Sequence, residues 1–425
     1  MTEDARFARE LAKRLSSLAP FPKSSFSGFG IVICAGGAAY FTNAYVLIHV
    51  LRHHLGCTLP IEVWHLGKRE MSRRMSFLLE ELDVRVVDAT DEPSAHAADI
   101  VDGWQLKSFA LMWCRFEKAL LLDADQIPTR DPASLACWPE FERVGAVLWP
   151  DAVDLLPENP IWAACGLAPR RATSVESGQI LIDKSRKWGA LSVARHLNER
   201  AHYYYNMLYG DKDTFLLAML LTDSAFELVP HRPATDRGMC LYQHDFQGAP
   251  LFQHRTGAKW RYAGEQDDLP GFVGMDACLV ALNNLRRKWN GLIFDAPSRS
   301  DAAQRAEERL VSAGGVTFLV PGEAPIQLEF FAEGDIGAGR SADRMNWRCE
   351  EERGEISLLI SDAFGPTWRL AEQAGGRWYG RSVVHPQIEA FAATGFIGSK
   401  ATLEAAGAWR KWPMPGRYDS QVLDL

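Results

Sequence analysis

Two carboxylates stand two residues apart directly after an apolar run of the chain. The run Ala119–Leu122 is typical of a buried strand, and Asp123-Ala124-Asp125 follows it. Two carboxylates at positions i and i+2 of a turn can both reach one divalent cation. Their hard oxygen ligands suit Mg²⁺ or Mn²⁺, either of which in turn binds a diphosphate. A solvated turn with an aspartate capping a helix is the structural alternative.

A second polar segment, residues 254–260, reads His-Arg-Thr-Gly-Ala-Lys-Trp. The His254 imidazole could complete a metal site, the Gly257 backbone could approach a phosphate, and Lys259 could neutralise that phosphate. A surface loop with an isolated histidine is the alternative reading.

Two further motifs carry carboxylates close to small or amide residues. Glu176-Ser177-Gly178-Gln179 precedes an apolar strand, and a tight loop of this composition could line a polyhydroxylated ligand. Gly210-Asp-Lys-Asp213 stands at the start of a helix predicted over residues 211–221. The alternatives are a polar loop entering a strand and an aspartate that caps a helix.

The elements around these motifs alternate between strands and helices. Short apolar runs typical of buried strands occur at residues 31–35, 61–64, 84–87, 119–122, 144–149 and 179–182. Helical periodicity lies between several of them, for example in Ala44, Leu47, Ile48 and Leu51. This order predicts an α/β fold with a mostly parallel sheet covered on both faces. Ligands in such sheets bind beyond the carboxyl ends of the strands, where Asp123 would lie.

Length and charge limit the functional classes. The 425 residues carry 46 basic and 54 acidic side chains, a formal net charge of −8, and the length favours two domains. The acidic balance argues against a nucleic-acid partner. No C-x-x-C pair supports a zinc site. No apolar stretch reaches the roughly 20 residues of a membrane span, so we expect no membrane span and a cytoplasmic location.

The character of the chain changes near residue 296, where short alternating strands separated by glycine and proline begin. We assign residues 1–27 to an N-terminal helical extension, 28–295 to the α/β domain and 296–425 to a small β-rich accessory domain. Trp347, Trp368 and Trp378 in the last domain could stack on sugars, but we expect them to form the core of a small sheet.

The motifs occur in a defined order, and their combination is more specific than any one of them. Together they resemble the fungal-type α-mannosyltransferase family, retaining glycosyltransferases with the GT-A (Rossmann-like) fold. The His254-x-x-Gly257-x-Lys259-Trp260 and Gly-Asp-x-Asp elements are also similar to those of glycogenin-like glycosyltransferases. The resemblance covers roughly residues 28 to 262. It is carried by Gly30–Gly37, Leu59–Trp64, Gln105–Lys107, Leu122–Pro128, Glu176–Gln179, Gly210–Asp213 and Phe252–His254.

The resemblance implies a role for each motif residue. It implies a divalent metal, Mn²⁺ or Mg²⁺, held by Asp123, Asp125 and His254. It implies a nucleotide beside Ala35, Gly36, Gly37, Tyr40 and Asp123. The donor sugar and diphosphate would contact Lys107, Gly178, Gln179, Lys212, Gly257 and Lys259. The implied catalytic carboxylates are Glu176, Asp211 and Asp213; we favour Asp213 beside the anomeric carbon and Glu176 on sugar hydroxyls.

The implied reaction moves a hexose, expected to be mannose, from a nucleotide-diphosphate sugar to a glycan or other hydroxyl acceptor. The donor would be GDP-mannose or a UDP-sugar, and a glucosyl or galactosyl transferase of the same fold is an alternative. The opening motif of haloacid-dehalogenase-type phosphatases also resembles Leu121–Asp125. That motif lies on a first strand and carries a threonine or valine where Ile127 stands here. A non-catalytic sugar-binding protein is a further alternative.

Overall fold

The architecture comes from a computed structural model of the chain. It describes residues 3–394 except for 68–69, 92–102, 237, 290, 292–299, 333, 335, 342–343, 345, 353, 362–365, 384 and 386. The chain divides into two compact units, Met1–Asp295 and most of the residues after Asp295. The predicted domain boundary near residue 296 lies outside the described residues.

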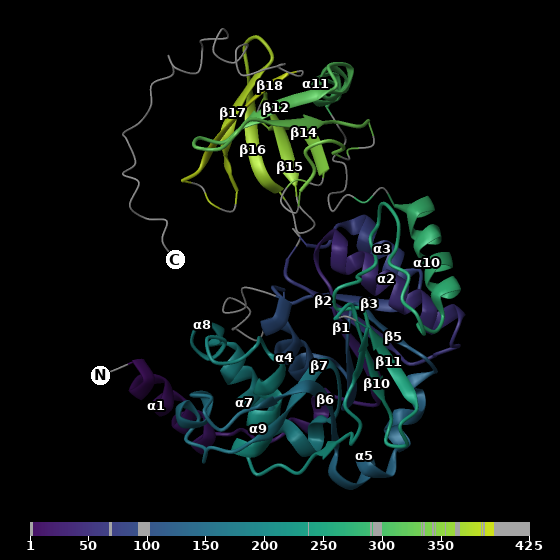
Figure 1. Ribbon diagram of the computed structural model, residues 1–425, viewed down its shortest axis with the longest axis vertical. Coiled ribbons are helices and arrows are strands. Elements are labelled where there is room, and N and C mark those ends of the chain that lie inside the picture. Colours follow the sequence, from purple (N-terminus) through teal and green to yellow (C-terminus); the bar gives the residue numbers. More distant parts are fainter. Residues whose placement is uncertain are drawn as a thin grey trace. The chain divides into compact units, whose positions relative to one another are not determined.

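A seven-stranded sheet forms the centre of the first unit, in the order β3-β2-β1-β4-β7-β6-β8 (Figure 1). Its neighbours pair in parallel except for β7, which runs antiparallel to both β4 and β6. The mostly parallel sheet of an α/β domain, predicted from the alternating elements, is therefore confirmed. The strands are β1 (Phe29–Cys34), β2 (Ile61–His65), β3 (Val84–Asp88), β4 (Lys118–Asp123), β6 (Ala146–Leu155), β7 (Ala172–Asp183) and β8 (Glu227–Leu228).

Helices cover both faces of this sheet because successive strand residues point to opposite sides. In β1, Ile31 and Ile33 pack into the core cluster of α2 (Gly37–His53), α3 (Arg73–Glu80) and α10 (Met275–Lys288). Val32 packs into the opposite cluster, which holds the remaining long helices of this unit. These are α1 (Glu3–Ser16), α4 (Gly103–Trp113), α7 (Lys184–Asn198) and α9 (Lys212–Leu221). Within the described residues, no helix is both long and apolar enough to cross a membrane.

Strand β7 corrects one expectation about the site. We expected residues 175–178 to form a tight loop before a short strand, whereas they lie inside the 12-residue strand β7. The cause is pairing with β6 beyond a register shift, which sets Trp149 opposite Glu176 and Pro150 opposite Val175. The polar residues of this motif therefore have a strand backbone that fixes their directions.

A second, smaller sheet was not predicted. Its four strands follow the order β5-β11-β10-β9, with bounds β5 (Gln126–Pro128), β9 (Ala234–Asp236), β10 (Cys240–His244) and β11 (Pro250–His254). β5 follows directly after Asp125 and pairs antiparallel with β11, so that Gln126 lies opposite His254. This pairing connects two motifs that are far apart in the sequence.

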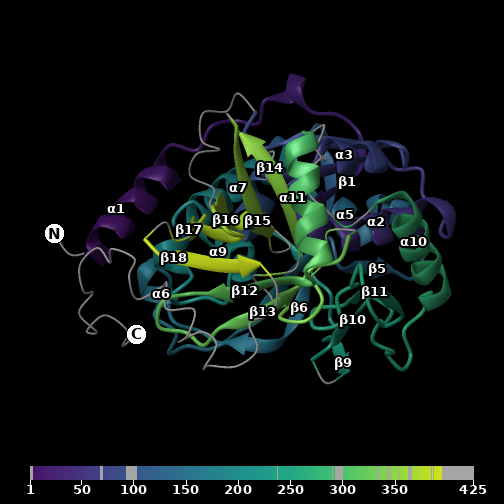
Figure 2. The same ribbon diagram turned by 90° about the horizontal axis from the view of Figure 1, so that it is seen from above.

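The second unit is a seven-stranded antiparallel sheet, ordered β13-β12-β18-β17-β16-β15-β14. Helix α11 (Asp301–Ser312) runs alongside β14 and β15 (Figure 2). Trp347, Trp368 and Trp378 are all buried in the core of this sheet, as expected from the sequence. The strands are β12 (Gly315–Leu319), β13 (Ile326–Glu329), β14 (Asn346–Glu352), β15 (Glu355–Ser361), β16 (Pro366–Gln373), β17 (Arg377–Ser382) and β18 (Glu389–Thr394).

Candidate active site

Asp123, Asp125 and His254 meet because two sheets join at the carboxyl end of β4. Asp123 is the last residue of β4, and Asp125 stands in the turn between β4 and β5. The Arg255 backbone N–H donates to the Asp125 carbonyl oxygen at 3.0 Å, which closes the β5/β11 pairing beside this turn. His254 is thus placed against both aspartates by backbone hydrogen bonds.

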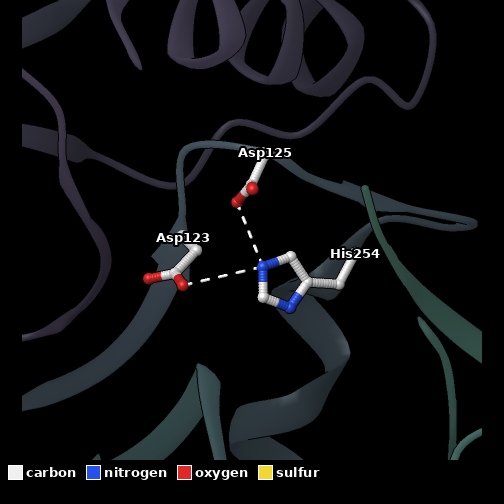
Figure 3. A group of neighbouring side chains, drawn as sticks. All are labelled: Asp123, Asp125 and His254. Carbon is white, nitrogen blue, oxygen red and sulfur yellow. Dashed lines mark ion pairs between the residues drawn. The ribbon is translucent and has the colours of Figure 1, made fainter. Parts of the chain in front are cut away.

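The three side chains have the spacing of ligands to one cation (Figure 3). His254 Nε2 lies 3.1 Å from Asp125 Oδ1 and 3.7 Å from Asp123 Oδ2, and one ligand atom from each residue lies within 4.8 Å of the others. Neighbouring ligands of an octahedral Mg²⁺-type ion are about 3 Å apart, given bonds of about 2.1 Å. The donor set and its spacing therefore fit a hard divalent cation.

Two lysines contact these aspartates from opposite sides. Lys107 of α4 places Nζ 2.8 Å from Asp123 Oδ1, 3.2 Å from Ser177 Oγ and 3.6 Å from Asp211 Oδ2. Lys259 forms an ion pair with Asp125 Oδ2, the oxygen that does not face His254. Burial opposes the charge of Lys107, but Asp123 and Asp211 outweigh it and raise its pKa. Both lysines therefore stay charged.

The position of Lys259 depends on a residue of α2. Asn43 is fully buried, and its Oδ1 accepts from the Trp260 backbone N–H at 2.8 Å. Asn43 Nδ2 donates to the Trp260 carbonyl at 3.1 Å. This double hydrogen bond holds the segment that follows β11 against α2, so Lys259 projects toward Asp125.

Asp211 belongs to this site and is not a simple helix cap. It occupies the N-cap position of α9, but its side chain makes no capping hydrogen bond. Its carboxylate lies beside Lys107 and is 96% buried, since the residue is 4% exposed. Burial raises the pKa of Asp211 to about 6, aided by the charges of Asp123 and Glu176 and opposed by Lys107 and by a hydrogen bond with Ser177. The capping alternative considered for the sequence is therefore wrong for Asp211.

Several buried polar atoms near the aspartates have no hydrogen-bond partner among the described residues. They are Asp211 Oδ2, His254 Nδ1, Gln126 Oε1 and Gln179 Nε2. Gln126 Nε2 donates to Gln179 Oε1, so each amide uses one end and leaves the other unsatisfied. An unsatisfied buried polar group is costly, and several in one place indicate that a polar ligand binds there.

Glu176 and Gly178 border the same cluster from β7. Glu176 Oε1 accepts from the Gly178 backbone N–H at 3.1 Å, and its charge acts on Lys107 and His254. A Cβ atom at Gly178 would lie 2.7 Å from both Gln126 Nε2 and His254 Nδ1. Gly178 is thus needed for the close approach of the histidine, a role different from the substrate contact predicted for it.

Asp213 lies in another environment, although we favoured it as the carboxylate beside the anomeric carbon. Its two oxygens accept from Ser174 Oγ at 2.8 and 2.7 Å, and Oδ1 also accepts from the Val175 N–H at 3.0 Å. Lys212, predicted to bind substrate, forms an ion pair with Asp151 instead. These contacts tie α9 to β6 and β7, so Asp213 serves the packing of this helix.

The predicted nucleotide residues surround the turn between β1 and α2. The Ala35 and Gly37 backbone N–H groups donate to the carbonyls of Trp64 at 2.9 Å and Glu70 at 2.8 Å. Gly37 has φ 73°, which favours glycine. Lys259 Nζ lies 5.6 Å from the centre of the Tyr40 ring, so this turn adjoins the metal cluster.

Some predictions about the site need revision and some residues were missed. The Gly257 N–H donates to the Met239 carbonyl at 3.1 Å, and the approach of a phosphate to this backbone stays a prediction. Sequence reasoning gave no role to Gln126, Ser177 or Asn43. The first two lie inside the motifs and could have been found there, whereas Asn43 is 217 residues from its partner Trp260 and carries no local signal.

Comparison with known protein families identifies the first unit. A family model described as "Mannosyltransferase putative" matches residues 28–162 and 168–254, more than half of the chain. The chain belongs to this mannosyltransferase family. The match contains every strand of the central sheet and also Asp123, Asp125 and His254. It confirms the resemblance derived from the motifs. It also agrees with the predicted GT-A-type α/β architecture.

Named relatives of this mannosyltransferase-family protein include three fungal enzymes. Alpha-1,2-mannosyltransferase MNN2 of Saccharomyces cerevisiae is 25% identical over 285 residues, covering 53% of this chain and 47% of the relative. MNN5 of the same species is 25% identical over 317 residues, covering 57% of this chain and 53% of the relative. MNN24 of Candida albicans is 28% identical over 233 residues, covering 45% and 32%. The chain spans about half the length of the first of these.

Solved structures with detectable similarity are more distant. The galactosyltransferase LgtC, in complex with donor and acceptor sugar analogues, has a TM-score of 0.36 and 14% identity, covering 61% of this chain and 100% of LgtC. The glycosyltransferase GlyE of Streptococcus pneumoniae TIGR4 has a TM-score of 0.36 and 18% identity, covering 61% and 64%.

Proposed function

We propose that this protein is a metal-dependent retaining glycosyltransferase that moves mannose from a nucleotide-diphosphate sugar to a hydroxyl group of a glycan or similar acceptor. The observation that carries the proposal is the group of buried, unsatisfied polar atoms beside Asp123, Asp125 and His254. Family membership supports the reaction class. The names of the fungal relatives, alpha-1,2-mannosyltransferases, support mannose and an α-1,2 linkage.

Asp123, Asp125 and His254 would hold the metal, with Mn²⁺ or Mg²⁺ as the expected ion. Four carboxylates (Asp123, Asp125, Glu176, Asp211) face two lysines and one histidine in this cluster, so a bound cation offsets surplus negative charge. The ion would supply electrostatic stabilisation of a diphosphate leaving group.

Lys259 and Lys107 have separate tasks in this proposal. Lys259 lies between Asp125 and the first turn of α2, the place where a diphosphate would connect metal and nucleoside. There it would bind the diphosphate and stabilise the charge that grows on it during bond cleavage. Lys107 would hold Asp123 and Asp211 at fixed positions through its contacts with both.

Asp211, in place of Asp213, is the carboxylate we propose beside the anomeric carbon. It is the one of the two that lies beside Asp123 and Lys107, and its Oδ2 accepts no hydrogen bond from the described residues, with Lys107 Nζ at 3.6 Å. A carboxylate there would stabilise positive charge that develops on the sugar. Glu176, together with the free ends of Gln126 and Gln179, would bind sugar hydroxyls.

The test is metal-dependent release of nucleoside diphosphate from a panel of GDP- and UDP-hexoses, with and without a mannoside acceptor. We expect turnover with GDP-mannose and Mn²⁺, its loss in EDTA, and an α-linked product. Release of phosphate from phosphomonoesters without sugar transfer would instead support the phosphatase alternative. Stabilisation by a nucleotide sugar without any turnover would support the sugar-binding alternative. The cytoplasmic location remains a prediction.

A further inference from the structure

Glu70 places a carboxylate directly against the turn that follows β1. A Cβ atom at Gly36 would lie only 2.1 Å from Glu70 Oε2, so the side chain of Glu70 covers this glycine. Oε2 accepts from the Leu66 backbone N–H at 2.8 Å, and the Glu70 carbonyl accepts from the Gly37 N–H at 2.8 Å. These two contacts fix both the backbone and the carboxylate of Glu70.

The second oxygen of this carboxylate is available. In the described part of the chain, no group donates a hydrogen bond to Glu70 Oε1 and no cation pairs with Glu70. Burial raises the pKa of the Glu70 carboxyl, with a smaller contribution from Asp88. A ligand that donates hydrogen bonds would stabilise the charged form of such a group.

The register of the sheet gives the spacing of the strand ends on either side of the Gly36 turn. Cys34 of β1 pairs with Asp123 on one side and with Trp64 on the other. Neighbouring strands are about 4.8 Å apart, so the ends of β4 and β2 are separated by about 10 Å. Glu70 follows β2, and the turn at Gly36 lies between it and the metal cluster. A nucleotide with its diphosphate near Lys259 and its base near Gly36 would span this distance.

The chemistry of a carboxylate distinguishes the nucleobases. Guanine presents two adjacent donors, N1–H and the N2 amino group, which match the acceptor oxygens of one carboxylate. Uracil presents a single N3–H between two carbonyl oxygens, and these oxygens would repel a carboxylate. A fixed, acceptor-only group at the base position therefore favours guanine over uracil.

We infer that the Glu70 carboxylate hydrogen-bonds to the nucleobase and thereby selects a guanosine diphosphate donor over a uridine diphosphate donor. The inference rests on the proposed function, since it needs a nucleotide between the metal cluster and Gly36. It assigns to Glu70 a specificity role that none of the sequence motifs contains.

Wild-type affinities for GDP, IDP and UDP in the presence of Mn²⁺ test the inference without any substitution. Inosine keeps N1–H but lacks the 2-amino group. We expect GDP to bind about tenfold or more tighter than UDP, with IDP between them, because a lost partner for a buried polar group gives discrimination of this order. Equal binding of GDP and UDP would overturn the inference.

The variant Glu70→Gln separates base reading from other roles. Its amide brings a donor that faces the guanine donors, so we expect GDP affinity to fall about tenfold while UDP affinity changes little. An equal loss for both nucleotides would place Glu70 on the ribose or in the support of the turn, and would overturn the inference. Glu80→Gln, an exposed glutamate on α3, is the matched control and should change neither affinity.

Failure of the inference can be told apart from failure of the proposed function. Turnover of a UDP-hexose with GDP-mannose inactive would refute the role of Glu70 and keep the glycosyltransferase. Absence of binding by every nucleotide and nucleotide sugar, in protein with a normal melting temperature, would refute both.

Discussion

Two lysines of the first unit, buried Lys107 and partly buried Lys212, pair with acidic side chains, and their surroundings differ. The Lys107 cluster comprises Lys107, Asp123, Ser177 and Asp211; the Lys212 cluster comprises Lys212, Asp151, Ser174 and Asp213. In the Lys212 cluster, Asp213 accepts hydrogen bonds from Ser174 and Val175, and Asp151 pairs with Lys212. In the Lys107 cluster, Asp211 keeps an oxygen that accepts no hydrogen bond from the described residues.

This difference assigns a stabilising role to the Lys212 cluster and a ligand-binding role to the Lys107 cluster. Satisfied buried carboxylates hold elements together, and removing one leaves its donors unpaired at a cost of about 1–3 kcal/mol. In the Lys107 cluster, Asp211 is ion-paired with Lys107, yet its Oδ2 accepts no hydrogen bond from the described residues, and folds tolerate such unsatisfied buried atoms chiefly at functional sites. We therefore expect substitutions in the Lys107 cluster and its metal ligands to reduce turnover, and substitutions in the Lys212 cluster to reduce stability.

The largest effect is expected from Asp125→Ala. It removes a metal ligand that also positions His254 and Lys259, so donor turnover should fall about 10³-fold. Turnover across a Mn²⁺ titration measures it. Asp268→Ala, an exposed aspartate, is the control and should match the wild type. Unchanged turnover in Asp125→Ala would remove the metal assignment.

Asp211→Asn should lower kcat by about 10²-fold with little effect on stability. The amide keeps the size of the side chain but removes its negative charge. Lys107 then loses its 3.6 Å ion pair with Asp211 but keeps its 2.8 Å ion pair with Asp123. Steady-state kinetics and thermal melting on the same sample measure both quantities. If the melting temperature falls by many degrees while kcat is preserved, Asp211 is a structural residue. The proposed difference in role between Asp211 and Asp213 is then refuted.

Asp213→Ala should do the opposite. It leaves the Val175 N–H and the Ser174 hydroxyl without their acceptor, so the free energy of unfolding should fall by about 2–4 kcal/mol. Urea unfolding measures this loss, and kcat of the folded fraction should stay within about fivefold. Asp213→Asn should recover part of the stability, because an amide oxygen can still accept from Val175. A kcat loss as large as that of Asp211→Asn would show that the two clusters work together.

Gly178→Ala tests the close approach of His254. The added Cβ would lie 2.7 Å from His254 Nδ1 and Gln126 Nε2, so either side chain has to move. We expect about tenfold weaker activation by Mn²⁺, measured as the metal concentration for half-maximal turnover. The control is Gly103→Ala, because a Cβ atom at Gly103 meets nothing within 4 Å, and we expect it to leave activation by Mn²⁺ unchanged. Unchanged activation in Gly178→Ala would mean that the histidine can shift without cost.

The smallest effect concerns His196, a buried and unsatisfied group outside both clusters. It is 4% exposed, and burial, with the charges of Arg200 and Arg14, lowers its pKa to about 3. The folded protein then binds fewer protons than the unfolded chain between about pH 6.5 and pH 3, so stability is full above pH 6.5 and falls as pH decreases. Its contribution between pH 7 and pH 5 is up to about 2 kcal/mol.

Urea unfolding at the two pH values measures this dependence, and His196→Asn should weaken it while leaving turnover unchanged. A lowered turnover would show that unsatisfied atoms far from the metal cluster also serve the reaction. The same pH dependence in variant and wild type would show that another group titrates.

A strand could be predicted from the sequence only where its own residues form a continuous apolar run. The apolar runs at residues 31–35 and 119–122 predicted β1 and β4 well, because a buried strand needs continuous apolar residues. The first half of β7 was missed, because Ser174, Glu176 and Ser177 break any apolar pattern and only pairing with β6 makes this segment a strand. The sheet of β5, β9, β10 and β11 was missed because its strands are short and β5 lies more than 100 residues from the others.

The sequence by itself determined the fold class and the family, since both depend on residue types in a fixed order along the chain, and it named Asp123, Asp125 and His254, which the β5/β11 pairing then brings together. It could not choose between Asp211 and Asp213. Positions i and i+2 at the start of a helix differ by about 200° in direction, so one side chain meets Lys107 and the other meets Ser174. Glu70 beside Gly36 and Asn43 beside Trp260 were likewise decided by tertiary structure, because a single polar residue carries no record of the distant backbone it contacts.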